Sequence, residues 1–123
     1  MPKRIQHERS EQNALVDWFK LTYKNELLIK IPNDAIRTCA QARTMFREGL
    51  VPGAPDIFIA APRGGLSGMF IELKRSNVKG QPKGKVSDKQ QAILDHLNSV
   101  GYLAIVSYGW DFARKAICQY MES

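Results

Sequence analysis

Three side chains in two short apolar segments are of the types that cleave phosphate esters. Asp56 opens the segment 56–61, and Glu72 and Lys74 lie two residues apart at the end of the segment that begins at Met69. Side chains alternate along a strand, so Glu72 and Lys74 would share one face. The seven residues between the segments include three glycines, which suits a hairpin loop. The pattern therefore predicts two carboxylates and one lysine at one end of a hairpin.

A pair of close carboxylates favours a divalent metal site. Like charges repel unless a cation lies between them, and hard oxygen ligands select Mg²⁺ or Mn²⁺. A lysine beside such a site can orient a water or neutralise a phosphate. The alternative is a half-exposed strand whose polar face carries Glu72 and Lys74 by chance. The preceding Pro55-Asp56, with fifteen residues between Asp56 and Glu72, favours the catalytic interpretation.

The formal net charge of +6 points to a polyanionic partner, and the basic residues cluster. Several follow the second apolar segment directly, interleaved with Gly80, Pro82 and Gly84. A basic loop beside a metal site is well placed to hold a phosphate backbone, whereas the alternative is a solvated connector. The predicted DNA-binding residues are Arg75, Lys79, Lys83 and Lys85.

The periodicity and the turn residues predict eight elements in the order α-β-α-β-β-α-β-α. Asn33 is a plausible cap for the second helix and Gly49 a plausible stop. Such a string favours an α/β fold with a mixed central β-sheet flanked by helices. After the first helix, the expected elements are strand 27–31, helix 34–48, strands 56–61 and 69–73, a helix beginning at 87, strand 102–108 and helix 110–121.

The first helix carries glutamates on its apolar side. Ser10 is a plausible cap. Glu8 and Glu11 share a stripe with Leu15 and Trp18, although first-turn acidic residues are also favoured by the helix dipole. The functional interpretation is a third carboxylate directed at the site. The apolar positions expected to recur along this helix are Ala14, Trp18 and Leu21, flanked by Leu15 and Phe19.

Gln90 has two interpretations. Ser87-x-x-Gln90 is a capping box, in which the glutamine side chain bonds back to the serine backbone. Gln90 also lies on the helical stripe of Ile93 and Leu94, so it can reach the sheet end that carries Glu72. Periodicity alone favours the cap.

Length and composition predict one domain over residues 1–123 in an ordinary globular protein. No apolar run approaches the roughly 20 residues of a membrane span, and the N-terminus is too polar for a secretory signal. Cys39 and Cys118 lack the spacing of a zinc site and are expected to be reduced and buried. We therefore expect a cytoplasmic protein with no membrane partner and no organic cofactor.

Pro55-Asp56 with Glu72-Leu73-Lys74 resembles the signature of the PD-(D/E)xK nuclease superfamily. The resemblance extends over nearly the whole chain to the VRR-NUC family, which implies a restriction-endonuclease-like sheet and Mg²⁺ or Mn²⁺. The segments that carry it are 31–37, 48–56, 70–74, Ser87-Asp88-Lys89-Gln90 and Gly101-Tyr102.

Residue by residue, the resemblance implies roles for five side chains. Asp56 and Glu72 would bind the metal, helped by the backbone carbonyl of Leu73 and by Glu11. Lys74, Gln90 and Glu11 would serve catalysis, so the resemblance favours a place for Gln90 in the site. Glu11 is preferred to Glu8 because it lies nearer the apolar face of the helix.

Small stand-alone members of this family are phage-type proteins that dimerise and cut branched DNA. The resemblance thus implies a metal-dependent endodeoxyribonuclease in a bacterial or phage-infected cell. It also implies a homodimer that acts on branched DNA such as four-way (Holliday) junctions. The candidate dimer surfaces are 27–31 and the first helix with Trp18, Phe19 and Tyr23. The alternatives are a catalytically silent DNA-binding module, a general nuclease acting on flaps or ends, and a small-molecule phosphatase.

Overall fold

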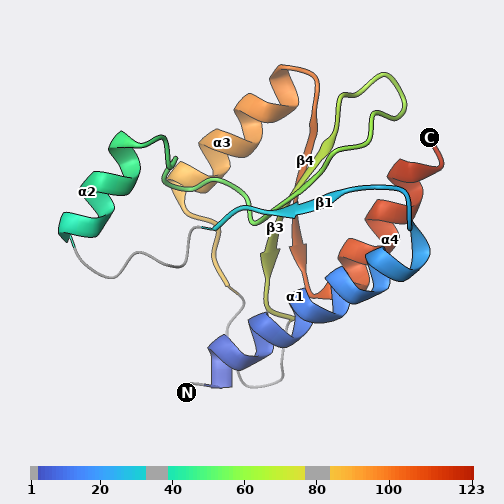
Figure 1. Cartoon of the computed structure of the whole chain (residues 1–123), viewed down its shortest axis with the longest axis horizontal. Helices are drawn as coiled ribbons and strands as arrows, with labels where there is room; N and C mark the ends of the chain where they lie inside the picture. Colours follow the sequence, from blue (N-terminus) through green and yellow to red (C-terminus); the bar gives the residue numbers. More distant parts are fainter. Residues whose placement is uncertain (1–2, 33–38, 77–83) are drawn as a thin grey trace.

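A computed structural model describes the backbone of residues 3–32, 39–76 and 84–123, and the side chains of 10–32, 40–76 and 84–123 (Figure 1). The predicted α/β fold and its element order are confirmed. The elements are α1 (Lys3–Thr22), β1 (Leu28–Lys30), α2 (Cys39–Arg47), β2 (Ile57–Ile59), β3 (Met69–Lys74), α3 (Asp88–Ser99), β4 (Leu103–Tyr108) and α4 (Trp110–Met121).

The four strands form one mixed sheet in the order β1-β2-β3-β4. The first three strands are antiparallel, whereas β4 runs parallel to β3. Arg63 and Leu66 form an isolated bridge in the hairpin between β2 and β3. Between them, Gly64 and Gly65 have φ angles of +55° and +81°, which suit glycine best and close the turn tightly. The predicted hairpin is confirmed, and it brings the ends of β2 and β3 together.

Helices α1 and α4 pack against each other and cover one face of the sheet (Figure 1). Leu15 and Phe19 of α1 are almost completely buried there, as is Ile117 of α4. From the sheet, β2 and β3 direct Ile57 and Ile71 into the same core. This apolar layer supports β2 and β3 on the face of the sheet that α1 and α4 cover.

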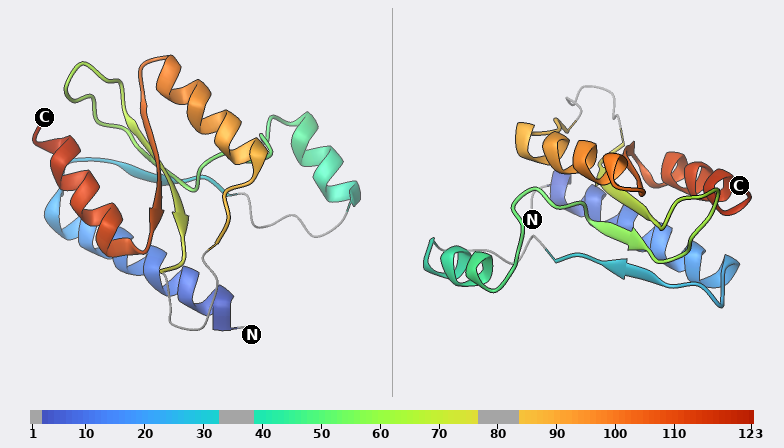
Figure 2. Two further views of the ribbon diagram at one scale, coloured as in Figure 1. Left: turned by 180° about the vertical axis from the view of Figure 1, so that it is seen from behind. Right: turned by 90° about the horizontal axis from the view of Figure 1, so that it is seen from above.

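Helix α3 crosses the opposite face and connects the two parallel strands (Figures 1 and 2). Leu94 of α3 and Ala104 of β4 are buried between them. The Asn98 side chain accepts a hydrogen bond from the Ala104 amide and donates one to the Ala104 carbonyl, at 2.9 and 3.0 Å. Asn98 therefore fixes α3 to β4 and sets the position of the whole helix over the sheet.

Helix α2 stands apart from the remaining elements (Figures 1 and 2). Among the described residues, it packs against no other helix or strand. Its C-terminus is well defined, because the amides of Gly49 and Leu50 bond the carbonyls of Phe46 and Met45, with Gly49 at φ +115°. The predicted stop at Gly49 is confirmed, whereas the predicted cap at Asn33 lies outside the described residues.

Two expectations for the first helix were wrong. Ser10 does not cap α1, because the helix already begins at Lys3, in a stretch rich in good helix formers. Leu21 is 74% exposed, and the core contacts come from Leu15 and Phe19 instead. None of the helices in the described part of the chain has the length and apolar content to span a bilayer.

Candidate active site

Asp56 and Glu72 lie side by side where β2 begins and β3 ends. Ile57 pairs with Ile71, so the residue before β2 falls next to Glu72 on the neighbouring strand. One carboxylate oxygen of Asp56, Oδ2, accepts a hydrogen bond of 2.8 Å from the Leu73 amide. Glu72 is only 5% exposed. The predicted convergence of the two carboxylates is therefore present, and Asp56 is fixed to the backbone of Leu73.

Glu72, Lys74 and Gln90 form a triangle of polar side chains. The Gln90 amide nitrogen Nε2 donates to Glu72 Oε1 at 3.3 Å, and Lys74 Nζ donates to Gln90 Oε1 at 3.2 Å. Lys74 Nζ also lies 3.9 Å from Glu72 Oε1. The Lys74 side chain is only 15% exposed, which strengthens these charged contacts. Gln90 thus holds the lysine and the glutamate in a fixed relation.

Gln90 performs both of the functions that the sequence offered as alternatives. Its Oε1 accepts a 2.9 Å hydrogen bond from the Ser87 amide, and Ser87 Oγ accepts one of 3.1 Å from the Gln90 amide. The same Oε1 accepts from Lys74, because a carbonyl oxygen has two lone pairs. Capping the helix therefore orients the amide toward the site.

Glu11 reaches the end of β3 from the other side of the sheet. Its Oε2 accepts a 2.8 Å hydrogen bond from the Ser76 amide, and its Oε1 accepts one from the Ser76 hydroxyl. Gly109, at φ +94°, lies against this pair, and a Cβ there would meet Ser76 Oγ at 2.5 Å and Glu11 Oε1 at 3.1 Å. Three distant segments meet at this point, which ties α1 to the end of β3.

The chemistry of the donor set fits a hard divalent cation. Asp56, Glu72 and the Leu73 carbonyl supply oxygen atoms only, which are the ligands that Mg²⁺ and Mn²⁺ prefer. Within the part of the chain that the structure describes, no three His, Cys, Asp or Glu side chains gather closely enough to hold a metal. Glu11 is engaged with Ser76. Its participation as a metal ligand therefore stays a prediction.

The basic residues divide into three groups. Lys85 is exposed, as a phosphate contact requires. Arg75 is only 1% exposed, so it does not contribute to a surface that faces DNA. It directly follows β3 and lies in the interior. The predicted contacts Lys79 and Lys83 lie outside the described residues, as does the side chain of Glu8, the alternative to Glu11.

Sequence reasoning missed three residues that shape the site. Ser76 binds Glu11, and Gly109 leaves room for both side chains. Gly84 is buried against the aliphatic part of Lys74, where a Cβ would lie 3.3 Å from Cδ. Each acts through a partner distant in sequence. The local pattern offered one signal only, which is that Gly84 and Gly109 adjoin predicted elements.

Ionisable groups with shifted pKa values occur on α1 and α4. Burial and a hydrogen bond with Cys118 raise the pKa of Tyr23 to about 12. Burial also raises the pKa of Tyr120, whose hydroxyl donates to the Ala61 carbonyl at 2.7 Å. Hydrogen bonds from Arg114 and Lys115 lower the pKa of exposed Asp111. Tyr23 and Tyr120 thus join segments that are distant in the chain, whereas Asp111 pairs within α4. Cys118 is a free thiol as expected, but it is only partly buried, and the side chain of Cys39 lies outside the described residues.

The fold and the site define a nuclease-type α/β domain, and the comparisons specify its family. The family model of the VRR-NUC domain matches residues 1–111. A solved structure titled "VRR_NUC domain protein" superposes with a TM-score of 0.78 at 25% identity, covering 94% of this chain and 88% of that one. No curated protein matches. The chain belongs to the VRR-NUC family, as the sequence motifs indicated.

Proposed function

We propose that this protein is a Mg²⁺- or Mn²⁺-dependent endodeoxyribonuclease that hydrolyses phosphodiester bonds in branched DNA, such as four-way (Holliday) junctions. One observation carries the proposal. A largely buried network is formed by Lys74, Gln90 and Glu72. It lies beside Asp56, where β2 begins and β3 ends. A silent DNA-binding module needs only surface charge, and it does not need this arrangement.

Each side chain of the site has a separate role in the proposed hydrolysis. Asp56, Glu72 and the Leu73 carbonyl would hold the cation, with Glu11 contributing from α1. When bound, the cation polarises the scissile phosphate and lowers the pKa of a bound water. Lys74 orients the attacking water or carries the charge that develops on the phosphate. Gln90 keeps the Lys74 ammonium at a fixed distance from Glu72.

DNA is the expected substrate because of charge and chemistry together. The chain carries a net charge of +6, and Lys85 is exposed on the segment that leads into α3. Phosphate contacts of this kind add affinity without reading sequence. Arg75 is omitted from this surface because it is buried. A phosphatase for small molecules does not require such a positive balance.

Cleavage of both strands of a junction calls for two copies related by a two-fold axis. We propose a homodimer, supported by the apolar segment at the sheet edge, where Leu27 is 57% and Ile29 42% exposed. Phe19 is removed from the candidate interface, since it is 1% exposed in the core of its own chain. Trp18 and Tyr23 contact the Phe19 ring, with centroids 6.4 and 5.3 Å away.

Metal-dependent thermal stability and cleavage test the proposal together. Mg²⁺ at 100 times its Kd should stabilise the folded protein by about 2.7 kcal/mol. Asp56→Asn should lose most of this effect and should not cut DNA. Asp95→Asn is the matched control, because Asp95 is an exposed carboxylate that bonds Gln91 on α3. Asp56→Asn that cuts at the wild-type rate would refute the assignment.

Substrate choice and assembly are tested on the wild-type protein. Sedimentation at micromolar concentration should give the mass of a dimer, and four-way DNA should receive paired nicks faster than linear duplex. A monomeric mass with equal cleavage of both DNAs would leave a general nuclease acting on flaps or ends. Metal-dependent hydrolysis of nucleotide monophosphates, but not of plasmid DNA, would point to a phosphatase instead.

A further inference from the structure

The outward face of α2 is basic and aromatic. Arg43 and Arg47 are exposed, and Phe46 between them is 41% exposed. At about 100° per residue, these three side chains lie within an arc of roughly 100° on the helix surface. The segment 39–47 contains no acidic residue, so nothing within the helix neutralises the two charges.

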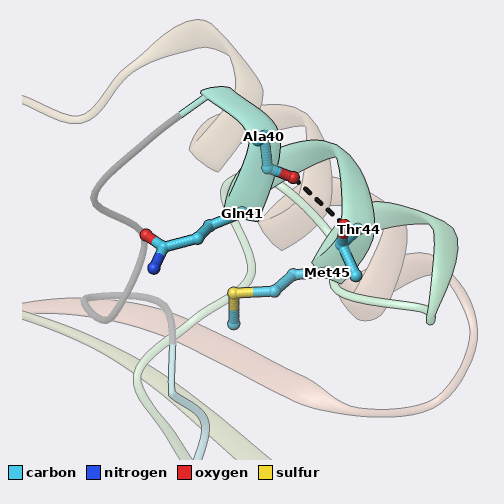
Figure 3. A pocket seen from close by; sticks show the side chains of 4 residues that line it. All are labelled: Ala40, Gln41, Thr44 and Met45. Carbon is cyan, nitrogen blue, oxygen red and sulfur yellow. Dashed lines mark hydrogen bonds between the residues drawn. The ribbon is translucent and has the colours of Figure 1, made fainter.

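The side of α2 opposite Arg43 carries uncharged side chains. Gln41 and Met45 lie about 160° around the helix from Arg43. Together with Ala40 and Thr44, which lie about 60° and 100° from Arg43, they line a hollow of about 350 Å³. Figure 3 shows Gln41 and Met45 pointing to the same side. All four lining residues are uncharged, and Thr44 Oγ1 donates to the Ala40 carbonyl. The helix thus has a distinct charged face, and that face contacts no other described helix or strand.

The chain that follows α2 is anchored next to the candidate active site. Gly53 has a φ of +84°, and a Cβ there would lie 3.0 Å from the Lys89 carbonyl carbon and 3.1 Å from the Gln90 nitrogen. The turn therefore rests on the first turn of α3, at the residue that orients Lys74. Helix α2 is in this way held at a set distance from the site while remaining outside the core (Figure 2).

We propose that the face formed by Arg43, Phe46 and Arg47 binds single-stranded DNA at a branch point. The two guanidinium groups contact backbone phosphates, and the Phe46 ring stacks on an unpaired base. Charge complementarity supports this partner, because the two arginines lie one helical turn apart with an exposed aromatic ring beside them, so phosphate and base contacts can form on one face. The proposal rests on the proposed nuclease function and specifies how a branch that carries an unpaired strand, such as a flap, is recognised.

DNA affinity, measured by fluorescence anisotropy in EDTA, tests the arginines apart from any cleavage. The probe is a labelled duplex that carries a single-stranded flap, titrated between 50 and 200 mM NaCl. Arg43→Ala with Arg47→Ala should lower the slope of log K against log salt by about 1.4–1.8, since each contact contributes roughly 0.7–0.9. Arg43→Lys with Arg47→Lys should keep most of the slope. The matched control is Lys20→Ala with Lys24→Ala, two exposed cations at the same spacing.

Phe46→Ala tests the aromatic part. Stacking on one base is worth about 1–3 kcal/mol, so preference for the flap over a blunt duplex should fall about 5- to 150-fold. Phe112→Ala is the matched control, because Phe112 is 57% exposed on α4. Thermal unfolding of each variant checks the fold, which α2 barely supports.

Two results would overturn the inference: a wild-type slope in the double alanine variant, or an equal loss in the lysine control. Unchanged flap preference in Phe46→Ala would remove the aromatic contact. Binding is measured in EDTA, so its result does not depend on cleavage. If DNA binds through α2 but the protein does not cut DNA when metal is supplied, only the nuclease function is refuted. Normal cutting with α2 variants that bind as wild type would refute only this inference.

Discussion

Comparing Gln90→Ala with Ser87→Ala separates the helix cap from the candidate active site. Gln90→Ala removes hydrogen bonds to the Ser87 amide, Lys74 Nζ and Glu72 Oε1 at 2.9, 3.2 and 3.3 Å. The first of these closes the capping box, and the other two belong to the site. Ser87→Ala removes only the serine half of the cap, because the Gln90 side chain bonds the backbone of Ser87.

The structure sets the size of both effects. Loss of a serine cap costs about 1 kcal/mol. The Gln90 bond to Glu72 involves a nearly buried carboxylate, and a hydrogen bond to a charged group contributes about 1.5–3 kcal/mol. With the exposed bond to Ser87, Gln90→Ala should cost about 2–4 kcal/mol. For a chain of this length, Tm should fall by about 3–5 °C in Ser87→Ala and about 6–20 °C in Gln90→Ala.

Cleavage rates complete the comparison. Side chains that orient catalytic groups typically contribute about 10- to 100-fold, so Gln90→Ala should cut DNA that much more slowly at saturating metal. Ser87→Ala should retain the wild-type rate. Gln91→Ala is the control for stability and rate, because the Gln91 side chain is exposed and bonds Asp95 at 2.8 Å. Calorimetry and single-turnover cleavage of one labelled DNA measure both quantities below each variant's Tm.

Either of two outcomes would refute this account of Gln90. A folded Gln90→Ala protein that cuts at the wild-type rate would show that Lys74 needs no such support. Equal loss of activity in Ser87→Ala and Gln90→Ala would show that only the start of α3 matters.

Three further substitutions test other contacts. Gly109→Ala should destabilise by about 1–3 kcal/mol in calorimetry, because it strains a φ of +94° and crowds Ser76 Oγ; an unchanged Tm would contradict this. Lys74→Ala should slow cleavage by about 10²–10⁴-fold with little loss of DNA affinity, and a parallel loss of both would reassign it to binding. Burial and Cys118 raise the pKa of Tyr23 from 10.0 to about 12, so the folded state retains the proton and stability falls as pH rises through that range. Measured by urea unfolding, the free energy of unfolding should fall less with rising pH in Tyr23→Phe than in the wild-type protein. An equal dependence on pH in the two proteins would contradict the raised pKa of Tyr23.

The fold was predictable because its signals are local. Glycines and prolines bound the short apolar strands, and Gly64-Gly65 adopts the tight turn that the linker indicated. Gly49 ends α2 as expected. The order of elements then limits the sheet to few arrangements. Alternation along β3 was sufficient to place Glu72 and Lys74 on one face.

The remaining features depend on contacts between residues that are distant in the chain. Glu11 bonds Ser76 across 65 positions, and no periodicity encodes that partner. Arg75 is buried directly after the end of β3, although it follows basic Lys74 and sequence charge alone places it at the surface. The sequence offered a helix cap and a contact with the sheet end as alternatives for Gln90. The structure combines them, because one amide oxygen accepts from both Ser87 and Lys74. Tertiary packing decided each case.

The pairing of α1 with α4 has a consequence for synthesis of the protein on the ribosome. Leu15 and Phe19 emerge early, yet their partner Ile117 is made about 100 residues later. At translation rates of about 5–20 residues per second, this apolar stripe waits roughly 5–20 s for its cover. A nascent chain in that interval is a natural client for chaperones. Because Glu11 reaches Ser76 only when α1 has docked, the candidate site is completed among the last events of folding.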